Sequence, residues 1–418
     1  MSGPVSPVLR PGDAMADDPL ARPLSLAHGP EIPNRFAKSA MSEQLAAPDG
    51  GPGSGILRLY ERWGAGGAGL LLTGNVMVDR RALGEPGNVV VEDDRHLARL
   101  TRWAAAAQAR GARLWMQVNH PGRQSPRTLS PEPVAPSAVP LEGMGGAFAA
   151  PRALEEREIH EIVRRFAATA EVAKRAGFAG VQIHAAHGYL VSQFLSPRTN
   201  RRTDAWGGSP ERRRRFLLEV VQATRAAVGT EVSVGVKLNS ADFQRGGITE
   251  EETVEVVRAL DDGSVDLLEI SGGTYERPEM WRAPARRSTF EREAYFLDFA
   301  ERVRGVATMP LMLTGGMRTR VGMVAALSGG AIDLVGLARP LAVEPDLPAR
   351  LLSRRADAAR RIDLSVGVRA IDAMIEACWY QFQIGRMGCG SSPRPGASRL
   401  AALHTIVKSL PRIGTRRG

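Results

Sequence analysis

Two histidines and a tyrosine stand within six residues, in the run His184-Ala-Ala-His187-Gly-Tyr189. Two imidazoles at this spacing can donate hydrogen bonds to one ligand oxygen, and a neighbouring phenol can deliver a proton. The histidines could instead form half of a metal site or be hydrogen-bonded structural side chains, but no third metal ligand of suitable type is evident at the neighbouring strand ends. The pattern predicts that His184, His187 and Tyr189 are catalytic and that no metal is bound.

A lysine and a glutamine stand near the ends of two other apolar runs. Only four of the 55 basic residues are lysines, and one of them, Lys237, lies in the apolar run 232–238. It could form a Schiff base if desolvation lowered its pKa, or it could be a fixed positive charge beside an anionic cofactor. Gln117 offers a carboxamide that can pair with the imide or amide edge of a ring. Both residues are candidate ligand contacts.

Paired residues late in the chain form a phosphate-binding pattern. Gly315-Gly316 lets backbone N–H groups approach an anion without an intervening Cβ. Ala338-Arg339 adds a guanidinium that can pair with phosphate in a fork. A plain tight turn followed by a surface arginine is the alternative. The four residues predict a site for a terminal phosphate, which suits a nucleotide-like cofactor and a sugar-phosphate substrate equally well.

Eight short apolar runs, each followed by a helical pattern, must position these residues. The expected strands are residues 36–40, 69–73, 113–118, 180–184, 232–238, 266–271, 310–314 and 332–337. The expected helices are residues 56–63, 94–110, 156–176, 210–228, 250–262, 292–304, 318–327 and 347–354. Eight strand–helix units without a GxGxxG fingerprint indicate an α/β fold with a single (β/α)8 TIM barrel. In that fold chemistry belongs at the carboxyl ends of the strands, where the residues above stand.

Three further segments complete the expected organisation. Residues 1–22 are expected to be a disordered leader without the apolar core of a secretory signal, and residues 23–355 to form the barrel. The Pro/Ser/Gly-rich segment 121–151 is expected to be a lid-like excursion over the barrel mouth after strand three. Residues 356–418 are expected to form a C-terminal helical extension and tail.

The composition limits the partners. The 418 residues carry a net charge of +10, but the arginines are spread through helices and loops, so nucleic-acid binding is not expected. No run approaches the ~18 consecutive apolar residues of a membrane span, which favours a soluble cytoplasmic protein. Two cysteines are too few for a disulfide framework or for the four thiolates of an iron–sulfur cluster. The sequence leaves a homo-oligomer open as an alternative to a monomer.

Five motifs occur in order along the chain. They are Asn34-Arg35 through Ser42, Gln117-x-x-His120-x-Gly122-Arg123, His184-Ala-Ala-His187-Gly-Tyr189-Leu190, Phe194-Leu195-Ser196-Pro197, and Asn200-Arg-Arg-Thr203-Asp-Ala-Trp206-Gly207-Gly208-Ser209. Together they resemble the Old Yellow Enzyme family of FMN-dependent oxidoreductases. The resemblance covers residues 23–348, and the run 184–209 is its most specific part.

This resemblance implies a non-covalent FMN site. The residues expected to lie along the flavin are Ser39, Ala40, Met41, Ser42 and Gly74. Gln117 would pair with the pyrimidine edge, and Lys237 would lie near N1 and O2. The residues expected to hold the phosphate are Gly315, Gly316, Ala338 and Arg339. The chain departs from the family at two positions, because Ser42 stands where some members have Cys or Thr and Gln44 where some have a substrate-facing Tyr.

The resemblance also implies an activity, in which hydride passes from NAD(P)H through FMN to the β-carbon of an α,β-unsaturated carbonyl compound. His184 and His187 would hold the carbonyl oxygen, and Tyr189 would protonate the α-carbon. Two alternatives remain open: a flavin-independent phosphate-binding barrel, such as an aldolase or isomerase using Lys237, and a flavin-binding sensor with little turnover. The first would be colourless, and the second would be yellow but not bleached by NAD(P)H.

Overall fold

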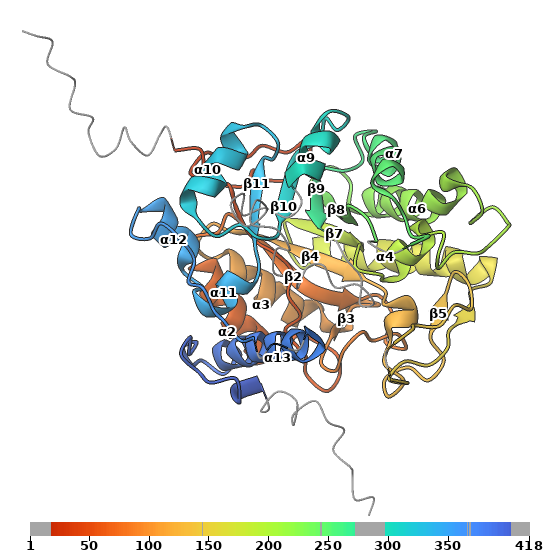
Figure 1. Ribbon diagram of the computed structural model, residues 1–418, viewed down its shortest axis with the longest axis horizontal. Helices are drawn as coiled ribbons and strands as arrows, with labels where there is room; N and C mark the ends of the chain where they lie inside the picture. Colours follow the sequence, from red (N-terminus) through yellow and green to blue (C-terminus); the bar gives the residue numbers. More distant parts are fainter. Residues whose placement is uncertain are drawn as a thin grey trace, which may run out of the picture.

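Eight parallel strands close into a barrel in the computed structural model, which describes residues 18–143, 145–242, 245–271, 297–365, 367 and 369–402. In order around the barrel, the strands are β1 (Phe36–Lys38), β2 (Leu70–Met77), β4 (Arg113–Asn119), β7 (Gly180–Ala185), β8 (Ser233–Asn239), β9 (Leu267–Ser271), β10 (Leu311–Thr314) and β11 (Leu334–Leu337). The barrel closes because β1 pairs with both β2 and β11. Figure 1 shows the strands at the centre and the helices around them, and the predicted (β/α)8 fold is confirmed.

A tryptophan fills the interior of the barrel. Trp115 on β4 is fully buried, and a Cβ at Gly180 or Gly235 would lie within 2.5 or 2.8 Å of its ring. These two glycines on β7 and β8 therefore make room for a large side chain. Because side chains fill the interior, a ligand pocket in this barrel has to lie at an end of the strands.

The second strand is longer than expected. The sequence predicts an end at residue 73, whereas β2 continues to Met77 and pairs there with the short strand β3 (Val89–Val90). Its pairing with β4 shifts register between Leu72 and Asn75. The strand continues because its last two residues, including Met77, are buried again beyond the irregularity.

The helices between the strands agree with the prediction to within a few residues where they are described. They are α2 (Ser54–Gly64), η1 (Asp94–His96), α3 (Leu97–Gln108), α4 (Glu156–Arg175), α6 (Pro210–Val228), α7 (Glu250–Leu260), α9 (Leu297–Arg304), α10 (Arg320–Ser328) and α12 (Leu347–Leu352). A single turn, η2 (Gly122–Gln124), stands at the start of the excursion 121–151 and is not predicted. Thr249 and Glu252 form the predicted capping box of α7. The first five residues of the predicted helix 292–304 lie outside the described residues. Two short helices in loops at the strand ends, α5 (Leu190–Leu195) and α11 (Arg339–Val343), are not predicted.

The excursion 121–151 leaves the barrel after β4 and folds beside the barrel mouth. Its strand β5 (Val134–Ala135) pairs with β6 (Arg152–Ala153). The Arg202 guanidinium donates to the backbone oxygen of Pro136 at 3.1 Å, which ties the segment to the loop before α6. None of its described residues lines the pocket described below.

The amino end of the described chain packs on the barrel. Leu20 is fully buried in the hydrophobic core, and the Asp18 carboxylate pairs with Arg320 on α10. Residues 1–17 of the predicted leader lie outside the described residues.

A long C-terminal helix, α13 (Arg369–Gly388), lies against α2, as Figure 1 shows. The Arg58 Nε of α2 donates to the backbone oxygen of Gly388 at 2.8 Å. The Gln381 side chain donates to the backbone oxygen of Glu43, in the loop after β1. The described part of the extension therefore packs on the barrel. No described helix combines the length and the apolar character needed to cross a membrane.

Candidate active site

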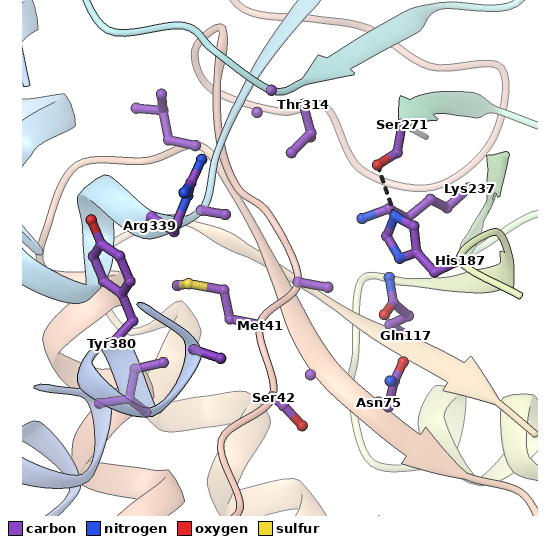
Figure 2. A pocket seen from close by; sticks show the side chains of 18 of the residues that line it. Met41, Ser42, Asn75, Gln117, His187, Lys237, Ser271, Thr314, Arg339 and Tyr380 are labelled. Atoms are coloured by element: carbon purple, nitrogen blue, oxygen red, sulfur yellow. Dashed lines mark hydrogen bonds between the residues drawn. The ribbon is translucent and has the colours of Figure 1, made fainter. Parts of the chain in front are cut away.

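A pocket of about 370 Å³ lies at the carboxyl ends of the strands. Every predicted site residue except Ser39 lines it, namely Ala40, Met41, Ser42, Gly74, Gln117, His184, His187, Tyr189, Lys237, Gly315, Gly316, Ala338 and Arg339. Figure 2 shows His187 and Lys237 on one side of this pocket and Arg339 with Tyr380 on the other. The fold therefore brings together residues that are up to 299 positions apart in the sequence, from Ala40 to Arg339.

Ser39 lies behind the pocket wall. Its Oγ is 2.8 Å from Oγ1 of Thr314, and Thr314 does line the pocket. A Cβ at Gly336, on the strand between them, would come within 2.0 Å of the Thr314 oxygen and 2.6 Å of the Ser39 oxygen. Ser39 thus fixes a pocket-lining hydroxyl instead of lining the pocket itself.

The two histidines and the tyrosine form one cluster at the carboxyl end of β7, to which His184 still belongs. The ring centroids of His184 and His187 are 5.0 Å apart, and those of His184 and Tyr189 are 4.8 Å apart. His184 Nδ1 accepts the backbone N–H of Ala186 at 3.2 Å, so a neutral His184 carries its proton on Nε2 and can donate from that atom. His187 Nε2 lies 2.9 Å from the Ser271 Oγ.

The surroundings of both histidines in this cluster favour the neutral imidazole. Burial, reinforced by the positive charge of Lys237, lowers the pKa of His184 and of His187 well below the usual value. Neutral imidazoles beside a phenol can donate hydrogen bonds to a ligand oxygen without adding charge to the free pocket.

His187 itself has unusual backbone geometry. Its φ is +60°, which a residue with a Cβ adopts at an energetic cost. Its backbone N–H donates to Oδ1 of Asn239 at 3.1 Å, and this bond helps to hold the turn. The strained turn places two histidines on the same pocket wall.

A chain of buried polar groups connects Gln117 with Lys237. The Gln117 Nε2 donates to Oε1 of Gln182 at 2.6 Å, and the Gln182 Nε2 donates to Oε2 of Glu269 at 2.8 Å. The other Glu269 oxygen lies 3.0 Å from the Lys237 Nζ, with both side chains almost fully buried. The chain orients the amide and the ammonium group that face the pocket. In this pair the Lys237 side chain faces the pocket with its Nζ held by Glu269, a placement that suits a positive charge beside an anionic ring.

A second buried cluster, which sequence reasoning missed, lies beneath the loop after β1. The Glu43 carboxylate accepts the backbone N–H of Gly74 at 2.6 Å and the hydroxyl of Tyr60. Lys38 donates to the backbone oxygen of Leu72 at 2.7 Å and to the Tyr60 hydroxyl at 3.1 Å. Burial lowers the pKa of Lys38 to about 8, against the opposing effect of Glu43. These bonds fasten the loop after β1 to β2, and both segments line the pocket.

The glycine pair after β10 and the arginine after β11 form the opposite side of the pocket. Gly315 and Gly316 have φ values of 140° and 75°, which L side chains rarely adopt, so glycine is needed at this turn. The Arg339 guanidinium lies 2.9 Å from Oε2 of Glu376 on α13. The helix α13 contributes five more pocket-lining residues that sequence reasoning missed: Ala377, Cys378, Tyr380, Gln381 and Ile384.

The donor set of the pocket fits FMN. It offers a carboxamide, an ammonium group, a glycine turn and a guanidinium, which match a heterocyclic ring edge, an anionic ring and a phosphate. The Oδ1 atom of Asn75 is buried, lines the same pocket and has no hydrogen-bond partner among the described residues. A buried polar atom of this kind calls for a ligand partner. Among the described residues, no group of three His, Cys, Asp or Glu side chains could hold a metal ion.

Acid is expected to destabilise the fold through His120. Burial lowers the pKa of His120 to about 4, whereas the histidine of an unfolded chain has a pKa near 6.5. Between these two pH values the unfolded state therefore binds a proton that the folded state does not bind. This proton uptake leaves the free energy of unfolding unchanged above pH 6.5 and lowers it as the pH falls from 6.5 toward 4. At pH 5 the loss of stability is about 2 kcal/mol. Urea denaturation at pH 7 and pH 5 should show a smaller acid loss for His120→Asn than for the parent.

The matched control is His160→Asn, at a partly exposed histidine on α4. It should keep the full acid loss of the parent. An acid loss that is equal in the parent and in His120→Asn would contradict the assignment to His120.

Comparison with known proteins agrees with this geometry. A family model described as the NADH:flavin oxidoreductase / NADH oxidase family matches residues 19–358. A protein of Hypocrea jecorina named NADH-dependent flavin oxidoreductase is 42% identical, with the match covering 81% of this chain and 90% of that protein. A structure of morphinone reductase in complex with tetrahydroNAD has a TM-score of 0.69 at 31% identity and covers 82% of this chain and 92% of its own. An old yellow enzyme homologue from Zymomonas mobilis has the same TM-score at 26% identity, with 82% and 95% covered.

Proposed function

The chain belongs to the NADH:flavin oxidoreductase / NADH oxidase family, and we propose that it reduces the activated C=C bond of α,β-unsaturated carbonyl compounds. It is an oxidoreductase with FMN as cofactor and a nicotinamide as reductant. The observation that carries the proposal is the cluster of two neutral histidines and Tyr189 on one wall of the pocket. Such a cluster can hold a carbonyl oxygen and supply a proton beside it.

FMN supplies the redox chemistry when it is bound, since it accepts hydride from a nicotinamide and gives hydride to a substrate. We assign its ring edge to Gln117 and Lys237, and its phosphate to the glycine turn and Arg339. The Lys237 ammonium offsets negative charge on the ring, while Glu269 keeps that ammonium in place.

His184 and His187 act on the substrate carbonyl. In our assignment each donates a hydrogen bond to the carbonyl oxygen, where negative charge develops as hydride reaches the β-carbon. The phenolic proton of Tyr189 passes to the α-carbon, so one hydride and one proton add across the double bond. Each of these hydrogen bonds strengthens as the negative charge on the oxygen grows.

Absorbance of the purified protein under anaerobic conditions tests this function. The protein should be yellow, NADH or NADPH should bleach it, and cyclohexenone should restore the oxidised spectrum. A colourless protein would support the flavin-independent barrel. In that case Lys237 would have to leave its ion pair with Glu269 to act as a Schiff-base nucleophile. A yellow protein that neither nicotinamide bleaches would support the flavin-binding sensor.

Replacement of Arg339 with alanine should weaken FMN retention roughly 10- to 100-fold. One charge-assisted hydrogen bond contributes on the order of 1.5–3 kcal/mol, and the variant also leaves the Glu376 carboxylate next to the phosphate without its partner. Titration of the quenching of FMN fluorescence measures the dissociation constant directly.

Arg110→Ala is the control for this variant, since Arg110 is exposed just before β4, at the amino ends of the strands. It should bind FMN like the parent. An unchanged affinity in Arg339→Ala would remove this residue from the phosphate site.

A further inference from the structure

The pocket contains a carboxylate that the mechanism above does not use. Glu85, in the loop between β2 and β3, lines the pocket together with Ser42 and Gln44. One of its oxygens, Oε2, accepts hydrogen bonds from the Ser42 hydroxyl and, at 3.0 Å, from the Gln44 Nε2. Both donors bind the same oxygen, which leaves Oε1 without a hydrogen-bond partner among the described residues.

The backbone conformation of the two loops around Glu85 fixes the position of its hydrogen-bond donors. Gln44 has a φ of +54°, a conformation that costs energy for a residue with a side chain. Gly87 has a φ of +74°, and a Cβ at this position would lie 2.8 Å from the backbone of Gln44. The Glu85 backbone N–H donates to Oδ1 of Asn88 at 2.7 Å. The loop after β1 and the loop between β2 and β3 therefore lie in close contact at Gln44 and Gly87, and the Gln44 amide reaches Glu85 from there.

The carboxylate has no compensating charge beside it. Among the described residues no arginine, lysine or histidine forms an ion pair with Glu85, and the neighbouring Glu43 carboxylate adds a further negative charge. Burial is the main cause that raises the pKa of Glu85, while the bonds from Ser42 and Gln44 oppose the rise. A charge kept inside a pocket without a counter-ion is costly, and such groups cluster at functional sites.

We propose that Glu85, oriented by Gln44 and Ser42, is a specificity-determining residue that accepts a hydrogen bond from a hydroxyl or N–H group of the substrate. The inference rests on the proposed function and adds the substrate class: unsaturated carbonyl compounds that carry a second, hydrogen-bond-donating group and no carboxylate. His184 and His187 bind the carbonyl oxygen, and the carboxylate of Glu85 binds the donor group. A substrate carboxylate would be repelled at the same point because two like charges would share a low-dielectric pocket.

Ligand titrations of the FMN-loaded enzyme test the inference. The probes are phenol, the 3- and 4-(hydroxymethyl)phenols and the 3- and 4-hydroxybenzoates, with the change in flavin absorbance as the readout. The parent should bind the better hydroxymethylphenol at least tenfold more tightly than either hydroxybenzoate. Glu85→Gln keeps the shape and an acceptor for Ser42 and Gln44 but removes the charge, so it should reduce this ratio by about tenfold. Its affinity for unsubstituted phenol should change less than threefold.

The control Glu61→Gln, on the exposed face of α2, should keep the ratio of the parent. A parent enzyme that prefers a hydroxybenzoate would overturn the inference without any variant. Normal phenol binding with an unchanged ratio in Glu85→Gln would also overturn it and leave the proposed function standing. If phenol leaves the flavin spectrum of the parent unchanged, the proposed function fails and the inference fails with it.

Discussion

Tyr189→Phe is expected to slow enone reduction by about 10²–10⁴-fold, which is the usual contribution of general acid catalysis. Reduction of the flavin by NAD(P)H should stay within a few-fold of the parent, because that half-reaction needs no proton from the phenol. Substrate binding should also be largely kept, since the carbonyl oxygen is assigned to His184 and His187. Stopped-flow absorbance of the flavin, recorded separately for each half-reaction, measures the two rates.

The pocket offers a second tyrosine as a matched control. Tyr380 lines the same pocket from α13, on the side of Arg339 (Figure 2). Tyr380→Phe should leave both half-reactions within a few-fold of the parent. If Tyr189→Phe reduces cyclohexenone at the parent rate, solvent or another acid supplies the proton and the role assigned to Tyr189 is wrong.

Lys237→Met is expected to destabilise the folded protein by about 3–5 kcal/mol, because it leaves the Glu269 carboxylate buried without its partner. Both side chains of this pair are at most 4% exposed, so water cannot solvate the remaining charge. Urea denaturation of the flavin-stripped protein, followed by tryptophan fluorescence, separates this effect from any loss of FMN binding.

A double variant isolates the charge. Lys237→Met combined with Glu269→Gln removes both charges and keeps an amide oxygen for Gln182, so it should recover most of the lost stability. If the double variant is as unstable as Lys237→Met, the loss comes from packing and not from the unpaired carboxylate. If Lys237→Met is as stable as the parent, the ion pair contributes nothing to the fold.

The barrel could be predicted from the sequence because each strand is a short apolar run that is buried on both faces. The capping box formed by Thr249 and Glu252 is a local signal, and the start of α7 that it predicts is confirmed. The pocket-lining residues followed from the fold, since polar and small residues placed after such strands meet at one end of the barrel.

The charged clusters could not be predicted in this way. Lys38 lies inside a predicted strand, and its burial depends on Tyr60 and on the backbone of Leu72, which are distant in sequence. Glu85 likewise meets its hydrogen-bond donors, Ser42 and Gln44, only in the folded chain, because they lie some forty positions earlier in the sequence. Local patterns report propensity and periodicity, whereas the burial of a charge is decided by partners that only the folded chain brings close.

The position of the C-terminal helix could not be predicted either, because it too depends on partners that are distant in the sequence. Its helical character is visible in the sequence, but its place beside the pocket depends on long-range contacts such as the Arg339–Glu376 ion pair. Ser39 illustrates a finer limit, since its neighbour Ala40 lines the pocket and Ser39 itself does not. A one-residue difference along an extended segment turns a side chain to the opposite face.

The helix α13 follows the complete barrel in the chain and takes no part in its strand pairing, yet it supplies one wall of the pocket. Substitutions on this wall can change the shape and polarity of the pocket while the strands and the glycine turn of the phosphate site stay as they are. Because this wall lies on the side of Arg339 and contributes Glu376 to its ion pair, such changes act first on the part of the pocket assigned to the phosphate. The residues of α13 that contact the barrel directly, such as Gly388 beside Arg58 and Glu376 beside Arg339, are the ones whose substitution would also disturb the barrel.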